Sequence, residues 1–380
     1  MRYTDKMNDW IHPLMVRWVL RGYAKKLQRR VKSRPELANK VDSEATKKHL
    51  DLYSRLGLPC TDKWLRFYSN LTGVVDYTYL PEDLYAARIE RVLNNCQRAE
   101  SEAEDKNLLS KFVDKQYLPQ TYLRFIRGLY FDSDYHCISR KEAEGILAHN
   151  NGSVIGKVAS DSFGGHDVMA FVYEGGHYIS REGIVLTCDW IEENTQNYIV
   201  QEQIKQCEFA AKFNNNSVNT CRITTLRLPW SGEMIVTKAA MRFGITKSAV
   251  DNLSSGGIAV GMSKNGELGS VAFSYKDMKP YTIHPSSRIV FKGLIHPYYE
   301  DMCKVVKQQA CKFPNFNIMS WDAVADENGN IKILEVNLVT QSTDFEQFAF
   351  GSFFGENTEK IIEWVADHLK YDNFKHFKTF

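Results

Sequence analysis

Residues 320–337, SWDAVADENGNIKILEVN, constrain the fold more than any other stretch of the chain. Two apolar runs flank residues 326–330, and the Asn-Gly pair in that segment supplies the positive φ angles that a tight hairpin turn needs. Residues 321–324 and 331–337 are therefore predicted to form the two strands of a β-hairpin.

This hairpin carries polar side chains that strands rarely contain. Asp322 lies in the first strand, and Glu335 and Asn337 lie two residues apart in the second. Side-chain alternation predicts that both share a face with Ile331 and Ile333. Asp and Asn are depleted in strands, whereas three converging oxygens are what Mg²⁺ takes when phosphates complete its shell. The alternative interpretation is a hairpin with ordinary polar positions.

The composition is that of a globular protein with more than one core. The 380 residues are 43% hydrophobic and 25% charged, which allows two or three subdomains. The net charge of +2 argues against nucleic acid as a partner. The eight cysteines are scattered without a Cys-x-x-Cys pair, which argues against zinc and fits a cytoplasmic protein. We expect neither a secretory signal nor a membrane span.

The first fifty residues are basic and have a helical pattern. They contain thirteen Lys or Arg and five Asp or Glu, with an apolar face at residues 10–20. One interpretation is a solvated helix that packs on its apolar side. The other is a surface for anionic membrane lipids or a lipid-linked acceptor, at the inner face of the membrane. Further helices are predicted at residues 82–99 and 101–116.

From residue 121 onward the pattern mixes strands with helices. Strands are predicted at residues 122–126, 154–158, 168–173, 184–186, 217–228, 234–243 and 258–262. A helix is predicted at residues 139–150, with Ser139 and Glu142 as its capping box, and another at residues 297–313.

Three features in this region could bind a nucleotide or an anion. Lys157 lies on the strand before a small-residue loop at 159–166, where backbone N–H groups could approach phosphates, although a plain hairpin turn explains the same residues. The strand end at residues 202–204 could hold the rim of an adenine or be a simple buried end. Arg222 and Arg242 would need anions if buried, or else lie on the surface.

The order of these features resembles the ATP-grasp ligases, and most of all the sugar-transfer-associated ATP-grasp branch found among polysaccharide-synthesis genes. The resemblance covers about residues 105–350, and its specific pieces are SVNTCRITTLR, VDNLSSGGIAVGM and SWDAVADENGNIKILEVN. It implies an α+β chain with an ATP-grasp fold, whose two α+β subdomains clasp ATP. The expected parts are an N-terminal helical lobe (1–104), a small subdomain (105–205) and a C-terminal subdomain (206–380).

The resemblance also implies a role for each motif. Lys106 and Lys157 would contact the ATP phosphates. The lid over the phosphates would be formed by Ser162, Phe163, Gly164 and Gly165. The adenine would be bound by Gln201, Glu202, Gln203 and Ile204. Two Mg²⁺ ions, which Mn²⁺ could replace, would be bound by Asp322, Glu335 and Asn337. Arg222 and Arg242 would stabilise the transferred phosphoryl group and the acyl-phosphate. The backbone N–H groups of Gly256 and Gly257, with Asn252, would take the carbonyl oxygen.

The implied reaction joins a carboxylic acid to an amine through an acyl-phosphate, with release of ADP and phosphate. Such chemistry depends mainly on positioning and charge neutralisation. The acid or amine would be a sugar acid, an amino sugar or an amino acid destined for a cell-surface polysaccharide, which rests on the family alone. Two alternatives stay open: a small-molecule kinase, and a nucleotide-binding scaffold without turnover.

Overall fold

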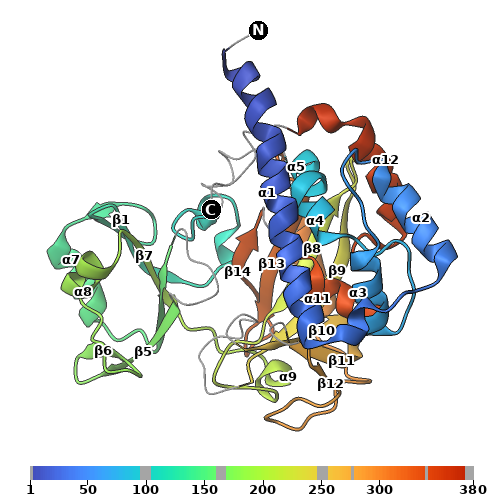
Figure 1. The fold of residues 1–380 in the computed structure, drawn as a ribbon. Coiled ribbons are helices and arrows are strands. Elements are labelled where there is room, and N and C mark those ends of the chain that lie inside the picture. The colour runs from blue at the N-terminus through green and yellow to red at the C-terminus, as the bar shows by residue number, and fades with distance from the viewer. Residues whose placement is uncertain are drawn as a thin grey trace.

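The computed structural model describes residues 3–94, 104–159, 168–245, 256–274, 278–338 and 341–372. It is an α+β structure in which N-terminal helices precede two seven-stranded antiparallel sheets (Figure 1). The helices are α1 (Tyr3–Ser33), α2 (Ser43–Ser54), α3 (Lys63–Thr72), α4 (Glu82–Leu84), α5 (Glu90–Leu93), α7 (Arg140–Ala148), α8 (Cys188–Asn194), α9 (Glu208–Ala211), α10 (Tyr299–Ala310), α11 (Asp344–Phe350) and α12 (Thr358–Asp367). The strands are β1 (Thr121–Ile126), β2 (Leu129–Phe131), β3 (Cys137–Ile138), β4 (Val154–Val158), β5 (Val168–Glu174), β6 (His177–Ser180), β7 (Asn197–Glu202), β8 (Cys221–Arg227), β9 (Met234–Phe243), β10 (Ile258–Met262), β11 (Leu268–Ser274), β12 (Pro280–Tyr281), β13 (Ile318–Ala325) and β14 (Ile331–Asn337).

The first sheet has the strand order β3-β2-β1-β7-β4-β5-β6, and α7 and α8 pack on it. Its central strands are held by the pairing of β7 with both β1 and β4. The predicted capping box forms at the start of α7, where the Ser139 backbone N–H donates to Glu142 and the Glu142 N–H donates to the Ser139 hydroxyl. The predicted strand at residues 184–186 is reduced to a single bridge at Val185.

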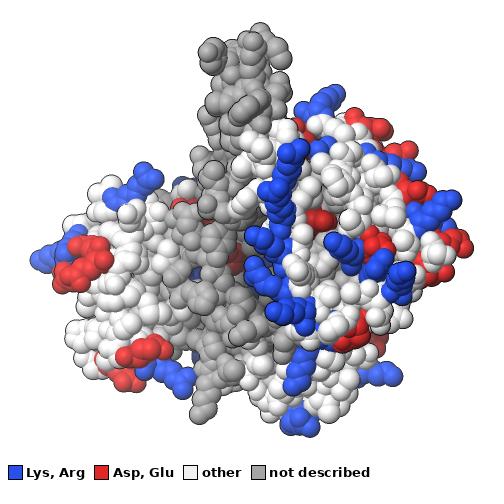
Figure 2. Space-filling model, viewed as in Figure 1, with Lys and Arg blue, Asp and Glu red and all other residues white. Residues whose placement is uncertain are grey.

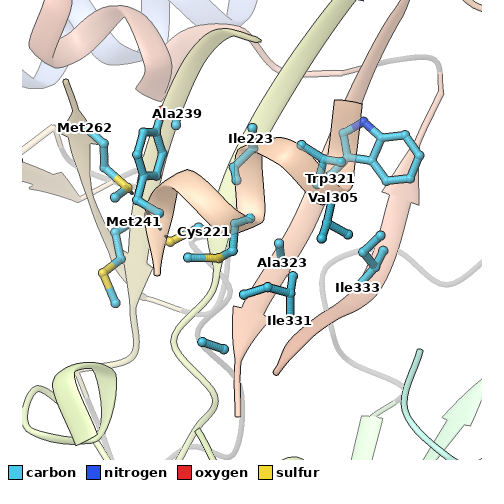
Figure 3. Close-up of a cluster of buried hydrophobic side chains, with 14 of the residues drawn as sticks. Cys221, Ile223, Ala239, Met241, Met262, Val305, Trp321, Ala323, Ile331 and Ile333 are labelled. Carbon is cyan, nitrogen blue, oxygen red and sulfur yellow. Dashed lines mark hydrogen bonds between the residues drawn. The ribbon is translucent and has the colours of Figure 1, made fainter. Parts of the chain in front are cut away.

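The second sheet has the order β12-β11-β10-β9-β8-β13-β14 and separates two layers of side chains. One face carries the main hydrophobic core, over which α10 packs (Figure 3). Trp321, Ile223 and Met241 point into this core from three neighbouring strands, and Val305 reaches it from α10. Residues that alternate with these point to the opposite face, which carries the polar site described below.

The N-terminal helices share their hydrophobic clusters with the second sheet. Leu27 of α1 and Phe67 of α3 pack in one cluster with Ala259 and Phe273 of the sheet. A second cluster joins α2 to β8 through Leu226 and to β13 through Ile318. Figure 1 shows α1 lying along this face of the sheet, with its first turns extending beyond the rest of the molecule. These helices therefore cover part of the polar face of the second sheet.

Two helix predictions need correction. Between residues 104 and 117, where a helix was expected, the described chain forms only short 3-10 turns at Leu109–Lys111 and Lys115–Tyr117. The helix expected at 82–99 is described as far as residue 93, and a π-helical turn at Tyr85–Ile89 divides it. The Asn107 N–H donates to Asp105 Oδ1 at 2.8 Å, a local side-chain hydrogen bond that competes with a helix at this point.

The predicted hairpin forms, but a bulge changes which side chains share a face. Asp322 pairs with Glu335, yet Ala323 pairs with Ile333, so Leu334 is an extra residue in β14. The bulge reverses the alternation, and Ile331 and Ile333 therefore point into the main core while Glu335 points away from it. The expectation that all of them share one face was wrong, although Glu335 and Asn337 still share a face with Asp322.

Candidate active site

The centre of the polar face is a row of charged residues on three adjacent strands. The register places Arg222 of β8 opposite Asp322 of β13, and Asp322 opposite Glu335 of β14. Arg242 of β9 lies opposite Thr220, one strand farther along. Directly opposed residues have Cβ atoms about 5 Å apart, so the pairing alone forces these side chains together.

Asp322 is held by both arginines. It is 3% exposed, and its carboxylate accepts hydrogen bonds from Arg222 Nε, from Arg222 Nη2 at 3.0 Å and from Arg242 Nη2 at 2.9 Å. Burial alone would raise the pKa of Asp322, but the two guanidinium charges outweigh it and hold that pKa below its usual value. Asp322 is therefore ionised at neutral pH, and both of its oxygens are occupied.

Two lysines approach the same row, one from the segment before β1 and one from β4 of the first sheet. Lys106 Nζ lies 3.6 Å from Glu335 Oε1, and the Lys106 backbone N–H donates to the carbonyl of Ala159 after β4. Lys157 of β4 donates to Gln201 Oε1 at 3.3 Å. Burial lowers the pKa of Lys157 to about 8, the charge of Lys106 adds to this, and Glu335 opposes it. The two lysines and Glu335 thus meet where the two sheets face each other.

The predicted metal ligands fit a cation only in part. Among the described residues, no three His, Cys, Asp or Glu side chains converge on a metal position. Glu335 is 37% exposed, and Asn337 Nδ2 is buried with no hydrogen-bond partner in the described part of the chain. Flipping that amide would place its oxygen in the unpartnered position, as a cation ligand requires. Asp322 could join them only if Arg222 or Arg242 released it.

The predicted adenine-binding segment is the end of β7. The Glu202 N–H donates to Gln120 and the Gln203 N–H to Ser153, so the sheet itself uses both groups. The Glu202 carboxylate accepts from the Gln120 N–H at 2.9 Å. Within the described ranges, the backbone N–H of Ile204 makes no hydrogen bond. Ile204 therefore supplies the available donor in this segment.

A sequence profile described as "Sugar-transfer associated ATP-grasp" matches residues 86–362. The chain belongs to this family. No curated protein matches. Family membership implies ATP and Mg²⁺, and the described helices include none that is long and apolar enough to cross a bilayer.

Similar solved structures include ATP-grasp ligases at low identity. D-alanyl-alanine synthetase A from Vibrio cholerae is 13% identical, with a TM-score of 0.42 and coverage of 73% of this chain and 68% of that one. An N5-carboxyaminoimidazole ribonucleotide synthetase is 13% identical, with a TM-score of 0.37 and coverage of 65% and 50%. The L-amino acid ligase from Bacillus licheniformis is 11% identical, with a TM-score of 0.38 and coverage of 71% and 48%. The chain spans about half the length of the last two, and similarity at this level assigns neither residues nor substrates.

The remaining predicted ATP-grasp residues are only partly described. Asn252 and the lid residues 162–165 lie outside the described residues. Gly256 has a φ of 103°, which favours glycine, and Gly257 follows it just before β10. Because Ala259 pairs with Arg242, the two glycines lie at the arginine end of the site.

The sequence prediction missed one buried acid beside the site. Glu346 of α11 is buried, and its Oε1 accepts a hydrogen bond from Thr224 Oγ1 at 3.3 Å, while Oε2 has no partner among the residues that the structure describes. Burial raises the pKa of Glu346 to about 8, against the lowering effect of nearby Arg222. In the sequence, Glu346 stands between two phenylalanines in the run DFEQFAF. An acid in such a helical pattern is normally predicted to lie on the exposed face of the helix.

Proposed function

We propose that this protein is an ATP-dependent carboxylate–amine ligase that forms an amide and releases ADP and phosphate. The observation that carries the proposal is the meeting of Lys106 and Lys157 with Glu335, beside the pair of arginines on Asp322. Four cations and two carboxylates give an excess of positive charge, which suits a site for a polyphosphate.

In the proposed reaction, a carboxylate oxygen of the acid attacks the γ-phosphorus of ATP, and the bond to the β–γ bridging oxygen breaks. ADP leaves and an acyl-phosphate remains. The amine nitrogen then attacks the acyl carbon, the carbon–oxygen bond to phosphate breaks, and the nitrogen loses a proton. Mg²⁺, when bound, would neutralise charge on the transferred phosphoryl group.

The position of each residue in the site suggests its role in this reaction. Lys106 and Lys157 would contact the ATP phosphates, and the Ile204 N–H would face the adenine. Arg222 and Arg242 would turn toward the phosphoryl group as it moves, leaving Asp322 available to the metal together with Glu335 and Asn337. These groups act by charge and orientation, which is what phosphoryl transfer requires.

The proposed substrates are a sugar acid and an amine used in the synthesis of a cell-surface polysaccharide. The support is the description of the family as associated with sugar transfer. A kinase would need the same cations but only one acceptor, whereas a scaffold would bind ATP without turnover. The number of substrates required for ADP release therefore separates the three functions.

The test is ADP release from Mg-ATP with a panel of acids alone, amines alone, and acid–amine pairs. The ligase predicts release that requires both members of one pair, with an amide of the expected mass. Release with a single substrate and a stable phosphorylated product would show a kinase. ATP binding without release on any pair would favour the scaffold.

The matched variants lie on one hairpin. Glu335→Gln should abolish turnover and keep the fold, because this side chain is partly exposed and outside the core. Glu327→Gln in the turn of the same hairpin should leave turnover unchanged, because Glu327 is exposed and its carboxylate lies 3.8 Å from Lys205 at the surface. Full turnover in Glu335→Gln would contradict the assignment.

A further inference from the structure

The outward face of α1 carries a continuous line of exposed cations. Arg17, Arg21, Lys25, Arg29 and Lys32 follow one another at intervals of four, four, four and three residues. At 3.6 residues per turn they fall within an arc of about 120° and extend over roughly 22 Å. Figure 2 shows this line of basic residues running down α1, and we call it the basic stripe.

No acidic side chain among the described residues pairs with the basic stripe. Residues 10–35 contain no Asp or Glu. Within the described ranges, none of the five cations forms an ion pair or a hydrogen bond. The contrast lies on the same helix, because the inward-facing Lys26 and Arg30 both pair with the buried Asp344. The inward-facing cations of α1 thus meet a buried acid, whereas those of the stripe face outward, where a partner can reach them.

Two large apolar side chains continue the same face toward the N-terminus. Leu14 is 54% exposed and Trp18 is 53% exposed, and both fall within the arc of the basic stripe. The opposite side of the helix is buried through Val16, Val19 and Leu27, which fix α1 to the rest of the molecule. The stripe is therefore presented on a firmly packed helix rather than on a loose tail.

We propose that α1 docks the protein on an anionic lipid bilayer, with the basic stripe on the headgroups and Trp18 and Leu14 at the interface. Cations beside an aromatic and an aliphatic side chain on one helix face match the chemistry of an interfacial membrane helix. A nucleic acid would use the charges but not the exposed Leu14. This docking rests on α1 alone and does not depend on the proposed ligase activity.

The test is co-sedimentation of the full chain with vesicles of phosphatidylcholine that contain 30% phosphatidylglycerol or none. Binding should require the anionic lipid and weaken when NaCl rises from 50 to 300 mM. Replacing Arg17, Arg21 and Lys25 with Gln should reduce the partition coefficient by about a hundredfold, at about fivefold per cation. Trp18→Ser should weaken the binding that persists at high salt.

The control removes three exposed lysines that lie away from α1, by Lys212→Gln, Lys264→Gln and Lys304→Gln. It changes the net charge equally and should leave vesicle binding unchanged. Equal loss in the two triple variants would overturn the proposal, because only net charge would then matter. No binding to anionic vesicles at 50 mM NaCl would also overturn it, as would binding to a DNA duplex in the absence of vesicle binding.

Discussion

Asp344 at the start of α11 should be essential for stability. Its carboxylate is fully buried and accepts hydrogen bonds from Arg30 Nη2 and from the Tyr68 hydroxyl at 3.2 Å, with Lys26 Nζ at 3.0 Å. Asp344→Asn keeps the size of the side chain but removes its charge. The change leaves the guanidinium of Arg30 buried beside a neutral amide.

The expected cost follows from the partners that remain. Breaking a buried ion pair by removing one member costs about 3–5 kcal/mol, because the other charge stays buried. Lys26 keeps Glu82 at 2.8 Å and is partly exposed, whereas Arg30 is the more deeply buried of the two cations that pair with Asp344. We therefore expect Asp344→Asn to lower the free energy of unfolding by about 3 kcal/mol, the lower end of that range. This is a large share of the roughly 5–15 kcal/mol that stabilises a typical domain.

The assay is urea unfolding of wild type and Asp344→Asn at neutral and acid pH. Burial would raise the pKa of Asp344, but the charges of Arg30 and Lys26 prevail and lower it. A lowered pKa adds stability that is complete above the unfolded-state pKa of about 3.9 and is lost as the pH falls through the folded-state value. The difference between the two proteins should thus shrink below pH 4. A difference under about 1 kcal/mol at pH 7, or one that does not change with acid, would refute this reasoning.

Two further predictions use the other shifted groups. The lowered pKa of Lys157, about 8, means that its charge is lost as the pH rises from 7 to 9, so ATP affinity should fall over that range and binding should take up protons. Calorimetry in two buffers of different ionisation enthalpy measures this, and an affinity that does not change with pH would contradict it. The raised pKa of Glu346, about 8, means that its contribution to stability is complete below about pH 4 and declines as the pH rises to 8. Glu346→Gln should remove that decline, so its melting temperature relative to wild type should increase from pH 5 to pH 8.

The hairpin and most strands could be predicted because their signals are local. The Asn-Gly turn and the apolar runs around it lie within eighteen residues, and the structure forms both strands there. The bulge at Leu334 could not be predicted, because nothing in the alternation around Ile331 and Glu335 marks an extra residue. Register in a bulged strand depends on what each face packs against, which is tertiary information.

The ion-pair partners of the charged residues could not be predicted from the sequence either. Arg222 and Asp322 are 100 positions apart, and only the pairing of β8 with β13 brings them together. The sequence could mark Arg222 as a cation that needs an anion if buried, yet it pointed to phosphate rather than to Asp322. Glu346 was missed because burial by α11 packing, not composition, makes it unusual.

The arginine pair on Asp322 bears on how ATP and metal would enter the site. A carboxylate whose oxygens are both taken by guanidinium groups is a poor ligand for Mg²⁺, and Arg242 is further held by Thr220 through two hydrogen bonds. Phosphate oxygens accept from guanidinium as well as carboxylate oxygens do. We expect that bound ATP draws a guanidinium group away from Asp322, whose freed oxygen could then join Glu335 and Asn337 as a ligand for the metal. Mg²⁺ should therefore bind weakly without nucleotide and tightly with it.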